Sequence, residues 1–109
     1  MPTVKNPLAV RKPPTKRNQP TAKLVPLGRT VATPAVLDAV PFLEIQIAMD
    51  RHRRRDWGDV CEEDRKRNDQ ALKTGERLLS VYKSGGGTKF WIITEWNRSV
   101  TTVLLPSDY

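Results

Sequence analysis

The sequence has one cysteine and one histidine in 109 residues. Cys61 alone cannot form a disulfide within the chain, which is typical of proteins of a reducing cytoplasm. His52 and Cys61 also lack the companion ligands that a zinc site needs. No apolar run approaches the roughly 18 residues that cross a bilayer, and no apolar segment follows the basic N-terminus as it does in a signal peptide. The sequence therefore predicts a cytoplasmic protein without a metal or other cofactor and without a membrane partner.

Acidic residues are absent from the first 30 positions, although the chain contains twelve of them. The same stretch holds seven of the nineteen Lys and Arg residues, which accounts for the whole formal net charge of +7. The twelve remaining cations are balanced by the twelve acidic residues. This segregation predicts a basic arm joined to a neutral domain. The seven cations are Lys5, Arg11, Lys12, Lys16, Arg17, Lys23 and Arg29.

Aromatic residues are also missing from the first 41 positions. Residues 1–23 contain five prolines and few large apolar groups. Proline fixes φ and has no N–H to donate, so neither a helix nor a strand ladder propagates through such a segment. Low hydrophobicity combined with high charge leaves too little apolar area to offset the entropy of ordering. We therefore predict a disordered, basic, Pro-rich arm at 1–23 and one small domain at 24–109.

The first part of the domain contains a short apolar stretch and a helix start. The first apolar cluster consists of Leu24, Val25, Leu27 and Val31, and it is interrupted by Pro26 and Gly28, which predicts an edge strand or an extended lead-in. Thr33 offers a hydroxyl at an N-cap, and Pro34 then occupies the first helical position. A short helix from there to residue 40 follows.

A second helix is predicted from Pro41 to about residue 54. Phe42, Ile45 and Met49 recur at helical spacing, which predicts that they form its buried face. The helix ends in the cationic run 51–55, and cations are favoured near the carbonyl groups of a helix C-terminus.

A third, very polar helix is predicted at about 60–74. Asp59 is the predicted N-cap, and Glu62 three residues later completes a capping-box pattern. Gly75 is the predicted stop, since glycine readily adopts the left-handed conformation that ends many helices.

Three β-rich runs complete the chain at 77–83, 89–95 and 99–105. Glycines 85–87 separate the first two runs, and a short turn around Trp96 separates the others. Such links are typical of antiparallel hairpins. The predicted fold class is α+β, with the N-terminal helices packed on one face of a three-stranded antiparallel β-meander.

Scattered motifs across 24–109 resemble a family of small bacterial proteins of plasmids and integrative elements, often labelled "plasmid-related protein". Where that family usually has an acidic residue after its Ile-Thr-Glu element, this chain has Trp96. The resemblance implies a mobile-element setting and no particular mechanism. The residues that carry it are Leu27-Gly28-Arg29, Ala32-Thr33-Pro34, Asp56-Trp57-Gly58-Asp59, Glu63-Asp64, Asn68-Asp69, Leu78-Leu79-Ser80, Trp91-Ile92-Ile93-Thr94-Glu95, Arg98-Ser99, Leu104-Leu105-Pro106 and Asp108-Tyr109.

The seven cations at positions 5–29 are the predicted nucleic-acid-binding residues. Phosphate contacts need charge but little geometry, so a flexible basic segment suits them. An acidic protein surface would be bound by the same charge and stays an equal alternative. The run at 51–55 could extend this footprint, although Asp50, Asp56 and Asp59 are near enough in sequence to neutralise it, which is the interpretation we favour.

Trp96 is the predicted protein-contact residue. It lies at a hairpin tip, where a large exposed ring suggests a partner. Trp91 is predicted in the core and Trp57 in a turn pinned to the sheet. The two edges of a three-stranded sheet also leave homodimerisation by strand pairing open.

A small ribonuclease toxin of barnase-like or RelE-like architecture is the alternative function. In that case His52, Arg98, Thr101 and Tyr109 would converge as base, phosphate clamp and proton donor. No spacing in the sequence requires this, and the analogy is one of fold only. We favour a non-enzymatic accessory protein of a mobile element that binds nucleic acid or an acidic protein through its arm and a protein partner through its domain.

Overall fold

A computed structural model of the chain describes residues 24–109. The predicted disorder of the basic arm therefore lies outside the described residues, as do six of the seven predicted nucleic-acid-binding cations; the seventh, Arg29, lies in the domain. The elements in chain order are β2 (Arg29–Ala32), α1 (Pro34–Ala39), α2 (Phe42–Arg53), α3 (Glu62–Thr74), β3 (Leu78–Lys83), β4 (Lys89–Thr94), β5 (Val100–Leu104) and the 3-10 helix η1 (Pro106–Asp108).

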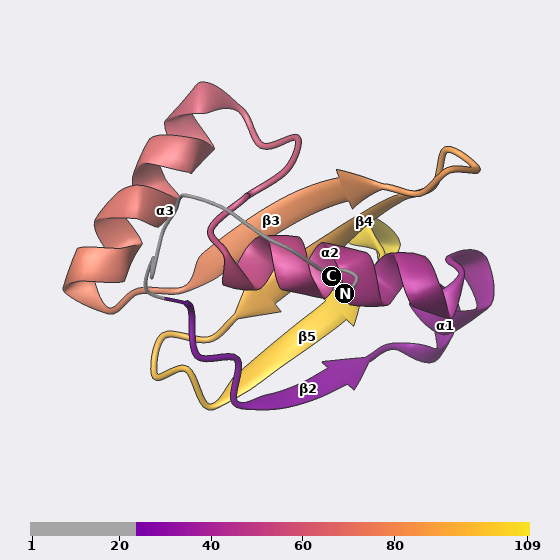
Figure 1. Cartoon of the computed structure of the whole chain (residues 1–109), viewed down its shortest axis with the longest axis horizontal. Coiled ribbons are helices and arrows are strands. Elements are labelled where there is room, and N and C mark those ends of the chain that lie inside the picture. The colour runs from indigo at the N-terminus through magenta and orange to yellow at the C-terminus, as the bar shows by residue number, and fades with distance from the viewer. Residues whose placement is uncertain (1–23) are drawn as a thin grey trace, which may run out of the picture.

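The sheet has four strands in the order β2-β5-β4-β3, as Figure 1 shows. Strands β3, β4 and β5 form the predicted antiparallel meander. Strand β2 pairs with β5 in parallel, with Arg29 opposite Val100 and Ala32 opposite Val103. The α+β class is thus confirmed, but the prediction of a three-stranded, purely antiparallel sheet is wrong. A parallel pair needs a long crossover, and the two strands of this pair are too far apart in the sequence for local patterns to reveal it.

The main core lies between the sheet and the pair α1–α2, which crosses the front of the sheet in Figure 1. Its buried side chains are Val36, Val40, Ile45, Ala48, Tyr82, Phe90, Ile92 and Val103. A second cluster attaches α3 and the lead-in segment to the sheet and consists of Val25, Trp57, Ala71 and Leu78. The prediction that Trp57 pins its turn to the sheet is therefore confirmed.

Trp91 is half-buried and not part of either core. Its neighbour Ile92 points into the main core, so Trp91 points to the opposite face of the sheet. There its ring stacks edge-on against Tyr109, with 5.7 Å between ring centroids. The prediction of a core Trp91 is corrected accordingly.

Helix α2 buries a different stripe from the predicted one. The buried residues are Ile45, Ala48 and His52, at spacing i, i+3, i+7. Met49 is half-buried, whereas Phe42 at the start of the helix is 65 % exposed. The helix start at Thr33-Pro34 is confirmed, since the Thr33 hydroxyl accepts a hydrogen bond from the backbone N–H of Val36.

Helix α3 begins at Glu62, and the predicted capping box is wrong. Its N-cap is Cys61, which makes no side-chain capping hydrogen bond. Asp59 is instead held to the sheet, because its backbone N–H donates to the carbonyl oxygen of Val81 at 2.7 Å. Gly75 ends the helix with φ = 77°, as predicted.

Candidate functional site

His52 is completely buried between α2 and the sheet, with no exposed surface. Its Nδ1 lies 2.6 Å from the Ser80 hydroxyl on β3, and its Nε2 lies 2.8 Å from the Thr94 hydroxyl on β4. The Trp57 ring packs edge-on against the imidazole, with 5.6 Å between ring centroids. Both ring nitrogens therefore have a protein partner, and solvent has no access to either.

The hydroxyls continue this network across the sheet. The Thr94 and Thr101 hydroxyls lie 2.8 Å apart, and Thr101 donates to the carbonyl oxygen of Leu27 at 2.7 Å. Since Thr101 donates there, its oxygen accepts from Thr94, and Thr94 in turn accepts from His52. The proton of the neutral imidazole is thus on Nε2, and Ser80 donates to Nδ1.

Burial lowers the pKa of His52 from 6.5 to about 4, and the positive charge of Arg98 lowers it further in the same direction. The imidazole is therefore neutral at physiological pH. A buried, neutral histidine with two satisfied nitrogens joins α2 to β3 and β4, and it has no free atom to offer a substrate.

We expect the domain to lose stability as the pH falls from about 6.5 to about 4. In that window the unfolded chain binds a proton on His52 that the folded chain does not bind, so unfolding is favoured by about 1.4 kcal/mol per pH unit. The measurement is urea denaturation across this range for the native chain and for His52→Gln, which keeps hydrogen-bonding groups but does not titrate. The difference between the two slopes isolates the histidine from the carboxylates. Equal slopes would contradict the assignment.

The four residues of the ribonuclease alternative do not converge on an open site. His52 and Thr101 are buried and belong to the network just described. Tyr109 lies on the opposite face of the sheet, beside Trp91. Nothing in this arrangement supports acid–base catalysis by these side chains, and sequence reasoning missed the partners Ser80 and Thr94 because both look like ordinary strand residues.

Arg98 holds the C-terminal end of α3 and the turn between β4 and β5. Its guanidinium donates to the carbonyl oxygens of Ala71, Glu76 and Glu95 at 2.7 to 3.2 Å. Arg98 itself has φ = 60°, a left-handed conformation that the turn imposes. Burial lowers the pKa of Arg98, because desolvation disfavours its charge. These three bonds give it a structural role at the mouth of a cleft.

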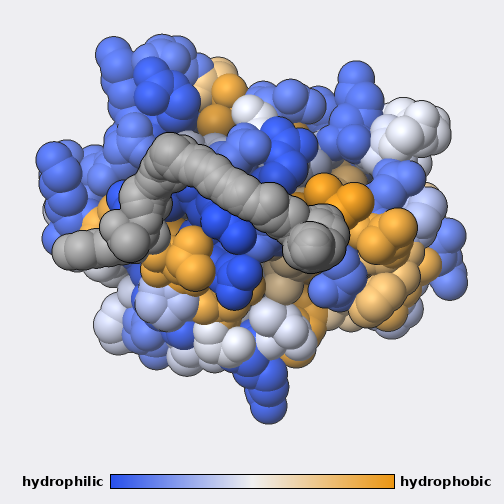
Figure 2. Space-filling model, in the orientation of Figure 1, coloured by the Kyte–Doolittle hydropathy of each residue, from blue (hydrophilic) through white to orange (hydrophobic). Residues whose placement is uncertain are grey.

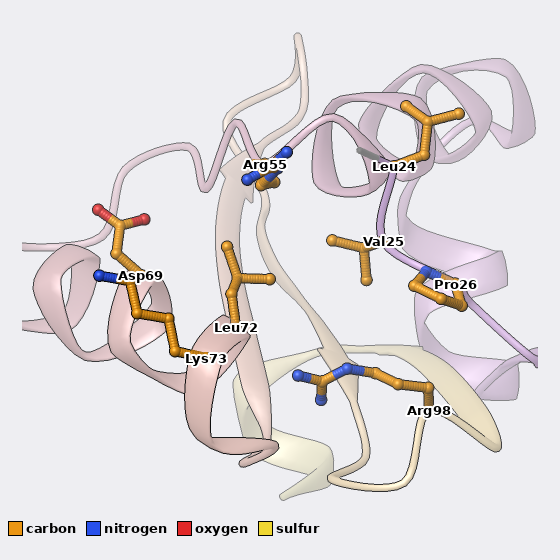
Figure 3. Close-up of a pocket in the computed structure, with 8 residues that line it drawn as sticks. All are labelled: Leu24, Val25, Pro26, Arg55, Asp69, Leu72, Lys73 and Arg98. Atoms are coloured by element: carbon orange, nitrogen blue, oxygen red, sulfur yellow. The ribbon is translucent and has the colours of Figure 1, made fainter. Parts of the chain in front are cut away.

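This cleft has a volume of about 480 Å³, and Figure 3 shows its lining. It lies between the lead-in segment, α3 and the β4–β5 turn. Figure 3 shows Arg55 above and Arg98 below a centre occupied by Val25 and Leu72, whereas the Lys73 side chain extends away from this centre on the α3 side. One carboxylate, Asp69, also lines the cleft and receives a hydrogen bond from the Trp57 indole N–H. Its remaining lining residues are Leu24 and Pro26.

The cationic run that ends α2 is largely neutralised within the domain. Arg51 pairs with Asp56 at 2.7 Å, and Arg53 and Arg54 both pair with Asp50 at 3.0 and 2.9 Å. These ion pairs lower the pKa of both carboxyl groups, and in Asp50 they outweigh the opposing effect of burial. The sequence-based interpretation is confirmed for Asp50 and Asp56, whereas Asp59 makes no ion pair with this run among the described residues.

A cluster of exposed apolar side chains covers α1 and the first turns of α2, and we call it the α1–α2 patch. Figure 2 shows orange spheres gathered over this part of the molecule. Its members are between 49 % and 70 % exposed, which is unusual for such large apolar groups gathered on one surface. Trp96, 64 % exposed, lies in the β4–β5 turn, away from this patch. The patch consists of Leu37, Phe42, Leu43 and Ile47.

No group of three His, Cys, Asp or Glu side chains in residues 24–109 is placed to hold a metal ion. No helix in the same range is long and apolar enough to span a membrane. Comparison of the chain with protein-family models, with curated proteins and with solved structures found no match. The resemblance to plasmid-related proteins therefore remains a prediction that rests on the motifs alone.

Proposed function

We propose that this chain is a non-enzymatic accessory protein of a bacterial mobile element, and that it binds nucleic acid through its basic arm. The observation that carries the proposal is the position of the cleft, which opens beside Leu24, where the arm joins the domain. Three cations line the cleft against one carboxylate. Positive charge at the cleft thus lies beside Leu24, the residue at which the chain enters the domain from the basic arm.

The distribution of the domain's other charges supports this location. Arg51, Arg53 and Arg54 share two carboxylates, Asp56 and Asp50, so most of the charge at the end of α2 is compensated and little is offered to a polyanion. A polyanion would gain most by lying along the arm and the cleft, where it releases counterions from its phosphates. Nucleic acid is favoured over an acidic protein because the arm has charge without apolar anchors, which protein interfaces usually contain.

The proposal is tested by fluorescence anisotropy with random-sequence duplex DNA and RNA across a salt series. Replacing the six arm cations at positions 5–23 with Gln is expected to remove most of the affinity and of its salt dependence. The double change Arg55→Gln and Lys73→Gln is expected to reduce the slope of log K against log salt by up to about 2 on duplex DNA, because each lost phosphate contact contributes about 0.9.

The matched control is Lys83→Gln with Lys89→Gln, which removes the same charge from the β3–β4 hairpin, far from the cleft. This control should leave the slope unchanged. An arm variant that binds like the native chain would mean that the arm does not bind nucleic acid. Gel analysis of the same RNA samples tests the ribonuclease alternative, which requires cleaved strands.

A second contact, with a protein, is favoured by the α1–α2 patch. Its four apolar side chains form a broader surface than Trp96, the residue predicted from the sequence. Trp96 stays a candidate of its own, since both surfaces are exposed and they lie in different parts of the domain. The patch would recruit a partner while the arm and cleft hold nucleic acid.

A further inference from the structure

The two edges of the sheet differ sharply in how their backbone groups are used. At the β3 edge, the Asn68 side chain donates to the carbonyl oxygen of Leu79 at 2.7 Å and accepts from its N–H at 3.1 Å. Val81 donates to the carbonyl oxygen of Trp57 at 3.1 Å and accepts from the N–H of Asp59 at 2.7 Å. Two of the three outward-facing residues of β3, Leu79 and Val81, are therefore satisfied, so another strand could pair with this edge only at its Lys83 end.

The β2 edge is open among the described residues. Arg29 donates its N–H to the carbonyl oxygen of Ser99, just before β5, and Thr33 donates to that of Val103 in β5, both at 3.0 Å. Because backbone groups alternate in direction along a strand, the N–H and C=O of Thr30 and Ala32 point to the outer side. Strand β2 carries no proline or acidic residue, the residue types that often protect an edge.

We propose that a second copy of this chain pairs with the β2 edge in antiparallel orientation, about a two-fold axis through Val31. In this register Thr30 of one copy exchanges two hydrogen bonds with Ala32 of the second copy, and the reverse pair does the same. Four outward-facing backbone residues, two from each copy, are thereby satisfied. The result is one continuous eight-stranded sheet with an isologous interface.

Charge complementarity selects a second copy over other extended segments. The same register places Arg29 opposite Thr33 of the second copy, on the same face of the sheet. The Thr33 hydroxyl donates to the Asp108 carboxylate at 2.7 Å. Each Arg29 is thus brought beside Asp108 of the second copy, and the symmetry forms this pair twice. Within residues 24–109 neither side chain takes part in an ion pair of its own chain.

Two cavities lie beside the β2 edge, where a second copy would pack. The cavities, of about 300 and 190 Å³, lie between β2 and α2 and share the lining residues Thr30, Gln46 and Met49. Phe42 lines the smaller one, at the Ala32 end of the strand. Two-fold pairing turns this end toward the Thr30 end of the second copy, so the exposed Phe42 ring approaches Met49 across the seam. The pairing thereby covers part of the α1–α2 patch.

The test begins with sedimentation of the full chain over a concentration series at physiological salt. The expected mass rises from one chain, 12.4 kDa, toward twice that value. Thr30→Pro removes an outward N–H while leaving the bonds to β5, and it should shift the equilibrium to monomer. A chain that stays monomeric up to hundreds of micromolar would overturn the proposal.

A charge-exchange experiment tests the register itself. Arg29→Asp alone creates two repulsive contacts in its own dimer, and Asp108→Lys alone does the same, so each variant should dimerise roughly tenfold more weakly or worse. In a heterodimer of the two variants, one contact pairs the native Arg29 of the Asp108→Lys chain with the native Asp108 of the Arg29→Asp chain. The other contact pairs the two substituted side chains, which also carry opposite charges. The mixture should therefore form a heterodimer of near-native affinity, which a folding defect could not produce. Failure of the mixture to associate would overturn this register.

Two controls separate the proposal from its competitors. Lys89→Asp changes charge at a site remote from β2 and should leave the dimerisation constant unchanged. Amide hydrogen exchange should show protection at Thr30 and Ala32 that decreases on dilution. Protection that is independent of concentration would mean that the chain covers its own β2 edge, and it would overturn the proposal.

Discussion

Replacement of His52 by Leu is expected to lower the free energy of unfolding by about 3 kcal/mol or more. The change leaves the buried Ser80 hydroxyl without its acceptor and removes one of the two partners of the Thr94 hydroxyl, which keeps its bond to Thr101. A buried polar group that loses its partner costs about 1–3 kcal/mol, and the lost packing of the imidazole adds to this. A domain of this size has a total stability of only about 5–10 kcal/mol, so the loss should be visible in any urea titration as a lower midpoint with an unchanged m-value.

The same network offers its own control. Adding Ser80→Ala and Thr94→Val to His52→Leu removes both hydroxyls, and apolar groups of similar shape can be nearly neutral when both partners are replaced. We expect the triple variant to recover at least about 1 kcal/mol relative to His52→Leu. If the triple variant is less stable than the single one, then packing around His52 matters more than the hydrogen bonds.

Gly58→Ala is expected to destabilise the domain by a comparable amount, about 3 kcal/mol. Gly58 has φ = 74°, and a Cβ atom there would lie 2.0 Å from the carbonyl oxygen of Val81. The backbone must therefore move away from β3, which breaks the bonds that Trp57 and Asp59 make with Val81. The cost combines left-handed strain of about 1–2 kcal/mol with the loss of two backbone hydrogen bonds.

Gly75→Ala is the matched control for this change. Gly75 has nearly the same φ, 77°, but a Cβ atom there would have no neighbour within 4 Å. Gly75→Ala should therefore lower the free energy of unfolding only by the left-handed strain of about 1–2 kcal/mol. Gly58→Ala also frees the backbone groups of the β3 edge. When both variants are compared at the same folded fraction, we therefore expect light scattering to show more aggregation for Gly58→Ala than for Gly75→Ala. Equal losses in the two variants would show that the close approach to β3 contributes nothing.

Local chemistry along the sequence accounts for much of this fold. Thr33 and Pro34 define a helix start with their own side chains, and Gly75 defines a helix end through its conformational freedom. The meander from β3 to β5 follows from short turns between β-rich runs. Such features depend on neighbours within a few residues, so the sequence by itself determines them. The segregation of positive charge into the first 30 positions is likewise a property of the sequence alone.

The tertiary structure decided the features that depend on distant contacts. His52 carries no sequence signal of burial, and only the packing of α2 on the sheet joins it to Ser80 and Thr94. The apolar start of α2 looked like core, yet the sheet accepts one stripe of that helix and leaves the α1–α2 patch exposed.

The sheet edges illustrate the same limit. Asn68 looked like one more polar residue of α3, but its side chain satisfies the edge of β3. Strand β2 has only four residues, and its place beside β5 comes from pairing across 71 positions of sequence, from Arg29 to Val100. The burial of a side chain and the hydrogen bonding of a sheet edge depend on which segments pack together in the folded chain. Short-range sequence patterns do not determine those long-range contacts.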